Sequence, residues 1–286
     1  MRLNENFQKA LGLLTCPACA KNTAADLTLV EEPSPALQCT VCRTGYPVVD
    51  GVIDFLPSYE ENRQPGLAQR LMENRAVVAF YERYFRPAFT RMGSPITYDE
   101  EMAWLKKIKT EIPVRTVLDL ACGTGKYARL LDDMYRPEFV FAADISLPML
   151  RQARTCAAAE SRENMIHLRA DAGALPFKKG VLDRVNCFGA LHLFPDVPRT
   201  LMELGRTAVD KAVFTCLTSR KVKGLSLIQS FFSRLATFQF FDENRLEKDL
   251  KEAGFSDMRR TCNKMVLAFS CVKTRPNFIQ ERSVSL

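Results

Sequence analysis

A short stretch near the middle of the chain, residues 117–126, most constrains the fold. It reads VLDLACGTGK, an apolar run followed by two closely spaced glycines and then the start of a helical pattern. The apolar run suits a strand that is covered on both faces, and the glycines let the backbone turn sharply and approach a ligand. A buried strand, a glycine loop and a helix in this order predict an α/β domain with a nucleotide-type cofactor site.

The charge beside the loop discriminates between cofactors. Asp119 stands at the end of the predicted strand, ahead of Gly123 and Gly125. A carboxylate there repels a pyrophosphate and attracts a cation, and S-adenosylmethionine carries a sulfonium and an ammonium but no phosphate. The run DLACGTG resembles the cofactor loop of class I methyltransferases, which use S-adenosylmethionine, and the resemblance implies that Ala121 also lines the site. The alternatives are a dinucleotide loop, since Ala128 completes G-x-G-x-x-A, and an ordinary strand–turn–helix.

Two further acids follow the next two predicted strands. Asp144 ends the second strand, where a carboxylate can accept the ribose hydroxyls; a helix-start carboxylate is the alternative. The run ADISLPML around it resembles the second cofactor motif of the same class and adds Ile145 to the expected site. In the resembled family an acid after the third strand binds the adenine amino group, and the next backbone N–H meets a ring nitrogen. Asp171 and Ala172 match those positions.

The fourth predicted strand leads into GALHLFPD, which resembles the motif beside the transferred methyl group and implies a cofactor contact at Cys187. His192 in this loop could act as a general base, because its unperturbed pKa is about 6.5. The alternative is that His192 orders the loop or lines the pocket, since methyl transfer from a sulfonium needs mainly alignment. Related methyltransferases often carry a tyrosine over the methionine end of the cofactor. Tyr81 matches that position, with simple packing as the alternative.

Two C-x-x-C pairs near the N-terminus predict a metal site. They are separated by nineteen residues, and the four expected ligands are Cys16, Cys19, Cys39 and Cys42. This spacing fits tetrahedral zinc, and four filled positions make the site structural rather than catalytic. Incidental or redox cysteines are the alternatives. Short strands at 27–30 and 36–38 would complete a zinc ribbon, and we expect Cys39→Ser to unfold it locally while cofactor binding stays largely intact.

The chain has 286 residues, which allows about two domains. The resemblance implies an α/β fold: a Rossmann-like, seven-stranded methyltransferase sheet that ends in an antiparallel hairpin, plus a small N-terminal zinc ribbon. The expected organisation is a zinc ribbon at 1–60, a linker and N-terminal helices at 61–112, and an S-adenosylmethionine-binding core at 113–286 with a helical lid insertion at 219–241.

Charge is unevenly distributed along the chain. The net charge is +7, but residues 1–60 hold seven acidic side chains against four basic ones. The basic excess includes residues 219–234, where it flanks an apolar run that would suit a lid facing water, an anionic substrate or a membrane surface; a packed core helix is the alternative. Without any run of eighteen apolar residues, we expect no transmembrane span and a cytoplasmic protein.

These features together resemble two groups of enzymes: ribosomal RNA guanine methyltransferases with a zinc finger, and small-molecule methyltransferases of the quinone-biosynthesis type. RNA binding normally requires a basic surface with aromatic platforms, and the ribbon is acidic. We therefore expect methyl transfer from S-adenosylmethionine to a small-molecule or lipid-like acceptor by direct displacement. The alternatives are a ribosomal RNA base methyltransferase with a zinc-finger recognition domain, and a non-catalytic, cofactor-binding interaction protein.

Overall fold

The computed structural model describes residues 5–19, 25–31, 34–56, 78, 97–222, 224, 229 and 238–274. Tyr81, most of the predicted linker and N-terminal helices (57–77 and 79–96) and most of the predicted lid lie outside these ranges. In the described part of the chain, every helix is too short or too polar to cross a bilayer.

The N-terminal region contains one helix and four short strands among its described residues. They are α1 (Glu5–Leu11), β1 (Leu27–Val30), β2 (Ala36–Cys39), β3 (Gly45–Val49) and β4 (Val52–Asp54). Each strand pairs antiparallel with the next one. Asp50 and Gly51 join β3 to β4 with φ angles of 51° and 76°, and a tight two-residue hairpin favours such a left-handed pair.

The remaining elements alternate between strands and helices until a final hairpin. In order they are α5 (Tyr98–Lys107), β5 (Thr116–Leu120), α6 (Lys126–Tyr135), β6 (Phe139–Asp144), α7 (Leu147–Ala159), β7 (Met165–Arg169), β8 (Leu182–Phe188), the 3₁₀ helix η2 (Leu191–Leu193), α8 (Val197–Thr207), β9 (Ala208–Ser219), α10 (Glu243–Glu252), β10 (Phe255–Asn263) and β11 (Val266–Lys273). Strands β5, β7 and β8 are buried along their whole length, as expected for parallel strands covered on both faces.

All strands join one sheet in the order β1-β2-β3-β4-β7-β6-β5-β8-β9-β11-β10. The strands from β4 to β9 in this order run parallel, and β11 and β10 close the far edge as an antiparallel hairpin. The chain moves outward from β5 to β7 and then returns to place β8 on the other side of β5. Ligands of open α/β sheets bind at such a reversal, outside the carboxyl ends of the strands.

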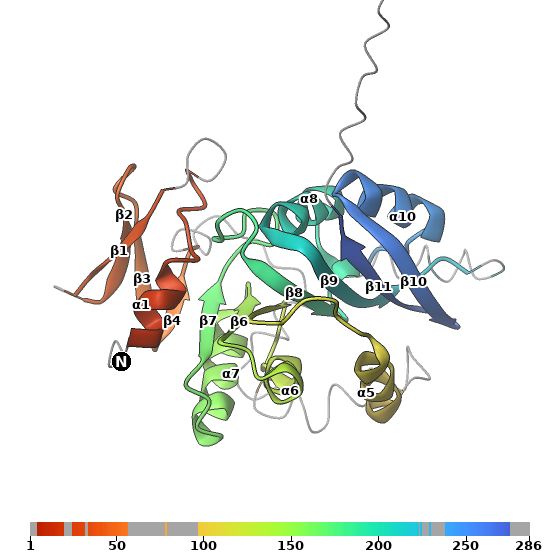
Figure 1. Cartoon of the computed structure of the whole chain (residues 1–286), viewed down its shortest axis with the longest axis horizontal. Coiled ribbons are helices and arrows are strands. Elements are labelled where there is room, and N and C mark those ends of the chain that lie inside the picture. Colours follow the sequence, from red (N-terminus) through yellow and green to blue (C-terminus); the bar gives the residue numbers. More distant parts are fainter. Residues whose placement is uncertain are drawn as a thin grey trace, which may run out of the picture.

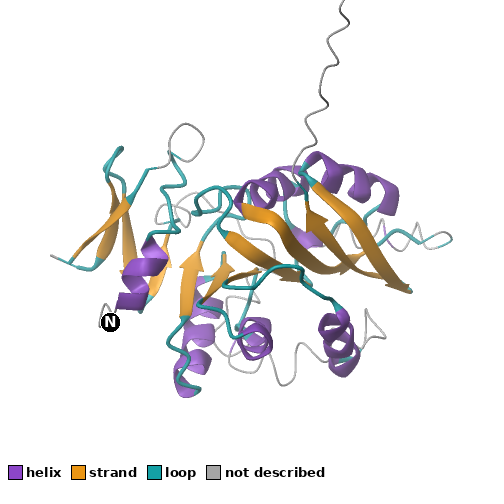
Figure 2. Cartoon of the chain, in the orientation of Figure 1, coloured by secondary structure: helices purple, strands orange, loops and turns teal. Residues whose placement is uncertain are grey.

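Helices cover both faces of the sheet (Figure 1). In the view of Figures 1 and 2, α8 and α10 lie above the sheet, and α5, α6 and α7 lie below it. The core on the α8 and α10 side is continuous from the N-terminal region to the parallel strands, because Leu14, Leu37 and Tyr46 belong to the same buried cluster as Phe141 and Phe177. The N-terminal strands therefore share a core with the rest of the molecule.

The described residues form an eleven-stranded sheet, where the sequence predicted seven strands. The predicted sheet with its terminal hairpin is present as β5–β11, and the other four strands come from residues 27–54. The count differs because β4 pairs in parallel with the edge strand β7. Sequence pattern cannot reveal a pairing between segments more than a hundred residues apart.

Candidate functional site

The glycine loop leaves β5 and enters α6 in an uncommon backbone conformation. Ala121, Gly123 and Gly125 have φ angles of 56°, 55° and 75°. A side chain is disfavoured in this left-handed region, so Ala121 is a strained position. A Cβ atom at Gly125 would lie 3.0 Å from the Cβ of Ala153 in α7, whereas one at Gly123 would meet no atom within 4 Å. The loop thus packs against α7 at one glycine and presents bare backbone to open space at the other.

Asp144, at the end of β6, connects this loop with the next one. Its Oδ2 accepts a hydrogen bond from the Gly123 N–H at 2.8 Å, and its Oδ1 accepts one from the Ser146 N–H at 2.8 Å. Burial raises the pKa of the Asp144 carboxyl, and these backbone donors oppose the rise. Each carboxylate oxygen keeps a further lone pair, so Asp144 can brace both loops and still accept hydrogen bonds from a ligand.

Asp119 of β5 is part of a buried polar row across three strands. Its side chain is 2% exposed. Asn186 of β8 donates from Nδ2 to Asp119 Oδ1 at 2.7 Å, and the Thr215 hydroxyl of β9 donates to Asn186 Oδ1 at 3.0 Å. Sequence reasoning did not identify Asn186 or Thr215. Both strands contain several polar residues, so the sequence did not single these two out; their buried polar groups need partners, which the strand register supplies.

Asp171 completes a row of acids at the carboxyl ends of β5, β6 and β7. It follows β7 by two residues, and its Oδ1 accepts a hydrogen bond from the Gly173 N–H at 2.9 Å, which closes a local turn. Ala172 beside it is partly exposed. Since the carboxyl ends of parallel strands meet at one edge of a sheet, the fold brings Asp119, Asp144 and Asp171 to the same edge.

Three other residues of the predicted cofactor site have distinct environments. Ala121 and Ile145 are partly exposed at this edge of the sheet. Cys187 is fully buried in β8, opposite Cys216 of β9, and its side chain belongs to the hydrophobic core. In this structure Cys187 therefore contributes to the core and exposes no surface to a ligand.

Aromatic side chains line the α5 and α6 side of the same region. The Phe188 ring, at the end of β8, lies 4.7 Å from the Tyr127 ring and 6.0 Å from the Trp104 ring. The Tyr127 hydroxyl donates a hydrogen bond to the buried carboxylate of Glu101. This cluster makes an apolar wall next to the start of α6.

His192 lies in η2, beyond the end of β8, and is 8% exposed. Its Nδ1 is 3.3 Å from the Thr218 hydroxyl oxygen, and its ring is 4.1 Å from the Phe238 ring. The Gln239 N–H donates to the His192 carbonyl at 2.9 Å, which fastens the far end of the predicted lid segment to this loop. Burial lowers the pKa of His192 to about 4, so the imidazole is neutral at neutral pH.

The four N-terminal cysteines converge on one point. Their sulfur atoms all lie within 4.8 Å of one another, and the Cys16–Cys42 and Cys19–Cys39 pairs are 3.6 and 4.0 Å apart. Tetrahedral zinc with bonds of about 2.3 Å places sulfur atoms roughly 3.8 Å apart, so the residues fit a four-thiolate metal. The Tyr46 hydroxyl, 3.0 Å from Cys16 Sγ, adds a hydrogen bond to one sulfur.

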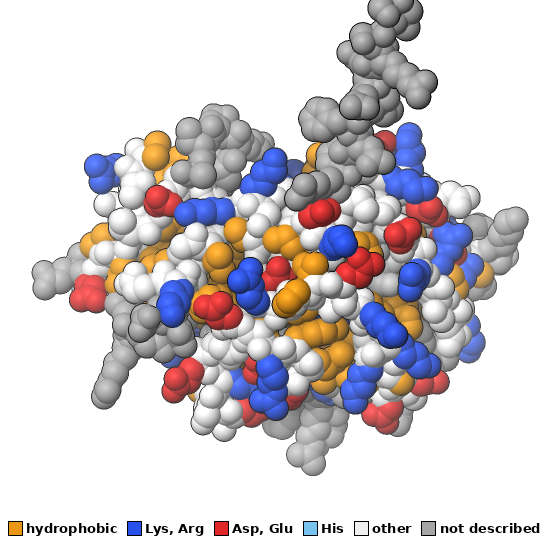
Figure 3. All heavy atoms as spheres, in the orientation of Figure 1, with side chains coloured by type: hydrophobic (Ala, Val, Ile, Leu, Met, Phe, Trp, Pro, Cys, Tyr) orange, Lys and Arg blue, Asp and Glu red, His pale blue; other side chains and the backbone are white. Residues whose placement is uncertain are grey.

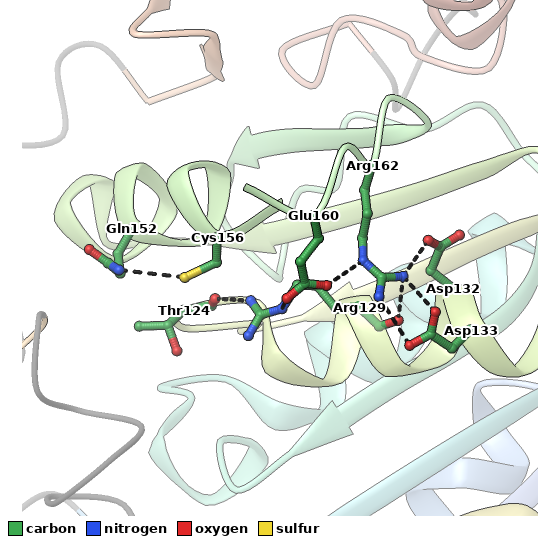
Figure 4. Close-up of polar contacts among 8 residues, drawn as sticks. All are labelled: Thr124, Arg129, Asp132, Asp133, Gln152, Cys156, Glu160 and Arg162. Carbon is green, nitrogen blue, oxygen red and sulfur yellow. Dashed lines mark hydrogen bonds and ion pairs between the residues drawn. The ribbon is translucent and has the colours of Figure 1, made fainter. Parts of the chain in front are cut away.

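A chain of ion pairs braces the glycine loop from α6 and the end of α7 (Figure 4). Arg129 donates from Nη1 to the Thr124 carbonyl at 2.9 Å, and its Nε lies 3.0 Å from Glu160. Glu160 also binds Arg162 at 2.7 Å, and Arg162 reaches Asp132 at 2.6 Å. Arg162 is only 14% exposed, so these pairs are screened less than surface pairs.

Comparisons with known proteins find similarity to methyltransferases. Residues 117–210 match a family model described as a methyltransferase domain. The chain is 26% identical over 280 residues to an uncharacterized chloroplastic methyltransferase of Arabidopsis thaliana, which covers 91% of this chain and 79% of that protein. It is 32% identical over 123 residues to a demethylmenaquinone methyltransferase of Thermus thermophilus, which covers 42% of this chain and 56% of that protein.

Two solved structures share the fold at low identity. Phosphoethanolamine N-methyltransferase 2 of Haemonchus contortus matches with a TM-score of 0.58 and 13% identity, over 71% of this chain and 60% of that one. A chain from the complex between the Haloferax volcanii Trm112 methyltransferase activator and a methyltransferase matches with a TM-score of 0.57 and 16% identity, over 69% and 97%. The chain therefore has the α/β fold of these methyltransferase structures, and residues 117–210 match the model of a methyltransferase domain.

Proposed function

We propose that this chain transfers the methyl group of S-adenosylmethionine to a small-molecule or lipid-like acceptor by direct displacement. The observation that carries the proposal is the row of acids Asp119, Asp144 and Asp171, at the ends of three neighbouring parallel strands and beside a glycine loop. A buried carboxylate at Asp119 attracts the cationic methionine end of the cofactor. The same charge disfavours a dinucleotide, whose pyrophosphate would lie at this loop.

The adenosine half of the cofactor would bind at the two neighbouring strands. Asp144 accepts hydrogen bonds readily and would hold the ribose hydroxyls, with Gly123 leaving room for the ligand. Asp171 would bind the adenine amino group, and the Ala172 N–H would meet a ring nitrogen. Ala121 and Ile145 would contribute contacts from the two loops.

The chemistry asks the protein for alignment and for exclusion of water. When bound, S-adenosylmethionine supplies an electrophilic methyl group on a positively charged sulfur. Phe188 and Tyr127 offer an apolar wall beside the start of α6. With a pKa of about 4, His192 is a weak base, which favours the loop-ordering or pocket-lining role over proton abstraction.

Charge and surroundings favour a small acceptor over RNA. The Phe238 ring lies 4.1 Å from the His192 ring and 5.0 Å from the Phe240 ring. The side proposed for the acceptor is therefore apolar. Basic and acidic side chains are interspersed on the face shown in Figure 3, without the single basic area that RNA binding requires. A lid at 219–241 would cover this side, and several relatives are demethylmenaquinone methyltransferases.

The N-terminal residues 1–60 would form a zinc ribbon around Cys16, Cys19, Cys39 and Cys42. All four tetrahedral positions are taken by thiolates, so the metal would have a structural role. A module of this size has little core of its own, and metal binding would supply much of its folding free energy.

Two measurements test the proposal. Calorimetry with S-adenosylhomocysteine should show binding, and NAD should not bind; absence of S-adenosylhomocysteine binding would overturn the cofactor assignment. The protein is then incubated with methyl-labelled cofactor and either total RNA or a metabolite extract. Label is expected in the small-molecule or lipid fraction. Label at one RNA position alone would establish the RNA alternative, and cofactor binding without any transfer would favour the non-catalytic one.

A further inference from the structure

The last strand of the N-terminal region lies directly beside the strand that leads to Asp171. In the parallel pairing of β4 with β7, Val52 stands opposite His167 and Asp54 opposite Arg169. The Phe55 N–H continues the ladder with a 2.9 Å hydrogen bond to the Arg169 carbonyl. The N-terminal region therefore reaches the carboxyl edge of the sheet at the point where the adenine-side loop begins.

A buried arginine connects this strand with the loop after Asp144. Arg169 Nη1 lies 3.0 Å from Asp54 Oδ2, and the two side chains are 4% and 7% exposed. The Nε of the same guanidinium donates to the Ile145 carbonyl at 3.1 Å. The other oxygen of Asp54 accepts the Leu56 N–H at 2.8 Å. One planar, multiply donating side chain thus holds the β6–α7 loop against an acid from the N-terminal region, and a lysine would not reproduce its fork of donors.

A second contact holds the far end of the Asp171 loop. Leu14 forms an antiparallel bridge with Phe177. The Thr15 N–H donates to the Pro176 carbonyl at 3.0 Å, and the Lys178 N–H donates to the Leu13 carbonyl at 2.9 Å. Thr15 immediately precedes the first predicted metal ligand, so the metal knuckle and the end of this loop are fixed to each other.

Two other ion pairs join the N-terminal region to the rest of the chain, and both are more exposed to solvent. Asp50 pairs with Arg151 at 2.8 Å, with side chains 62% and 38% exposed, and Asp26 pairs with Lys178, with side chains 69% and 30% exposed. Solvent-exposed pairs of this sort contribute little. The Asp54–Arg169 pair is the buried one among them, and breaking a buried pair leaves an uncompensated charge inside the protein.

We propose that Asp54 and Arg169 are positioning residues for the adenosine half of the cofactor site, and that the N-terminal region supports this half directly. The proposal rests on the proposed function. Arg169 fixes the carbonyl of Ile145, next to Asp144, while β4 and residues 13–15 hold the two ends of the segment that contains Asp171. Cofactor affinity then depends on the N-terminal region, contrary to the expectation from sequence that loss of the ribbon leaves cofactor binding largely intact.

The test measures the binding of two ligands to full-length variants by calorimetry. S-adenosylhomocysteine reports on the whole site, and methylthioadenosine reports on the adenosine half. Asp54→Asn removes the charge that orients Arg169. Arg169→Lys keeps a cation for Asp54 but loses the hydrogen bond that the arginine Nε donates to the Ile145 carbonyl. We expect both variants to bind both ligands roughly tenfold to a hundredfold more weakly, the effect of losing a hydrogen bond to a charged group.

Asp50→Asn is the matched control, because it removes another carboxylate of the same hairpin that pairs with an arginine of α7. It should bind both ligands as the unmodified protein does. Thermal unfolding and metal content of every variant identify a loss of folding, and Arg169→Lys provides a folded variant if Asp54→Asn is unstable. Unchanged affinity in a folded Arg169→Lys protein would overturn the inference while leaving the proposed function intact. Failure of the unmodified protein to bind either ligand would instead refute the proposed function, and this inference with it.

Discussion

Asn186 donates a hydrogen bond from Nδ2 to Asp119 Oδ1 at 2.7 Å across the centre of the parallel sheet. The amide is held in this orientation because its oxygen accepts a hydrogen bond from the Thr215 hydroxyl. A carboxylate buried to 2% exposure needs such a partner, since an unpaired buried charge is strongly disfavoured. Asn186 therefore supplies a hydrogen bond to Asp119 and holds its carboxylate at the position proposed for the methionine end of the cofactor.

Asn186→Ala should weaken S-adenosylhomocysteine binding roughly tenfold and leave methylthioadenosine binding almost unchanged, because only the first ligand carries the amino-acid end. Calorimetry with both ligands measures the difference. Thr215→Val is a milder variant at nearly constant volume and should change affinity in the same direction by a smaller factor. An equal loss for both ligands would show that Asn186 supports the sheet as a whole.

Asp144→Ala should weaken S-adenosylhomocysteine and methylthioadenosine binding alike, by about 1.5–3 kcal/mol, the value of a hydrogen bond to a charged group. The variant loses the proposed ribose acceptor and also the acceptor for the Gly123 and Ser146 N–H groups. Glu252→Ala, at the end of α10 and with a side chain that is 62% exposed, is the control. An affinity that does not change in Asp144→Ala would refute the ribose assignment.

Purified protein should contain one zinc ion per chain. Elemental analysis under metal-retaining conditions checks the stoichiometry, and chelation should lower the midpoint of thermal unfolding because metal binding contributes folding free energy. Chelation should also weaken cofactor binding if the N-terminal region supports the adenosine half. Cys262→Ser, which alters an exposed cysteine away from the four sulfurs, should change neither quantity, and metal-free protein with unchanged stability would contradict the zinc assignment.

Stability should fall as the pH drops from 6.5 toward 4. Burial lowers the pKa of both histidines, His167 and His192, to about 4, so the unfolded chain binds protons in this range that the folded chain does not. Each neutral ring then contributes about 3 kcal/mol to the free energy of unfolding above pH 6.5, and this contribution is lost by pH 4. Thermal unfolding at several pH values measures the slope, and His167→Gln with His192→Gln should flatten it. The same slope in the double variant would assign it to carboxylates.

Replacement of a buried arginine should stabilise the protein. Arg184 of β8 is 0% exposed, and its three side-chain nitrogens have no hydrogen-bond partner among the described residues. Its guanidinium carbon lies 4.7 Å from the centre of the Tyr135 ring. Arg184→Met keeps the apolar contacts and removes the desolvated charge, so unfolding should require about 1–4 kcal/mol more free energy. Arg184→Ala leaves a cavity and serves as the comparison, and destabilisation by both changes would indicate that the charge is compensated.

Local signals predicted the secondary structure around the candidate site and the cysteine cluster, where the residues concerned lie close together in sequence. The loop from Asp119 to Gly125, the acid at Asp144 and the cysteine knuckles each depend on a few adjacent residues, and the structure has the corresponding strand, turn, helix and thiol cluster. The Asp50-Gly51 turn between β3 and β4 is also a local feature.

Long-range contacts were beyond such reasoning. The partner of Asp54 is 115 residues away, and nothing in the spacing of either residue identifies the other. Asn186 lies in a run of strand-forming residues, so its role became visible only when the register placed it opposite Asp119. His192 in GALHLFPD was a candidate general base on its residue type alone. Burial lowers its pKa and so makes it a weaker base.

The pairing of β4 with β7 also has a consequence for synthesis of the chain on the ribosome. Cys16 and Cys42 are 26 residues apart, so the N-terminal region can close around a metal soon after it leaves the exit tunnel. The neighbour of β4 is synthesised only much later, and until then β4 presents an unpaired edge, which is open to wrong pairing with other chains. Metal supply during translation should therefore influence how much protein escapes aggregation, even where the finished molecule retains its metal firmly.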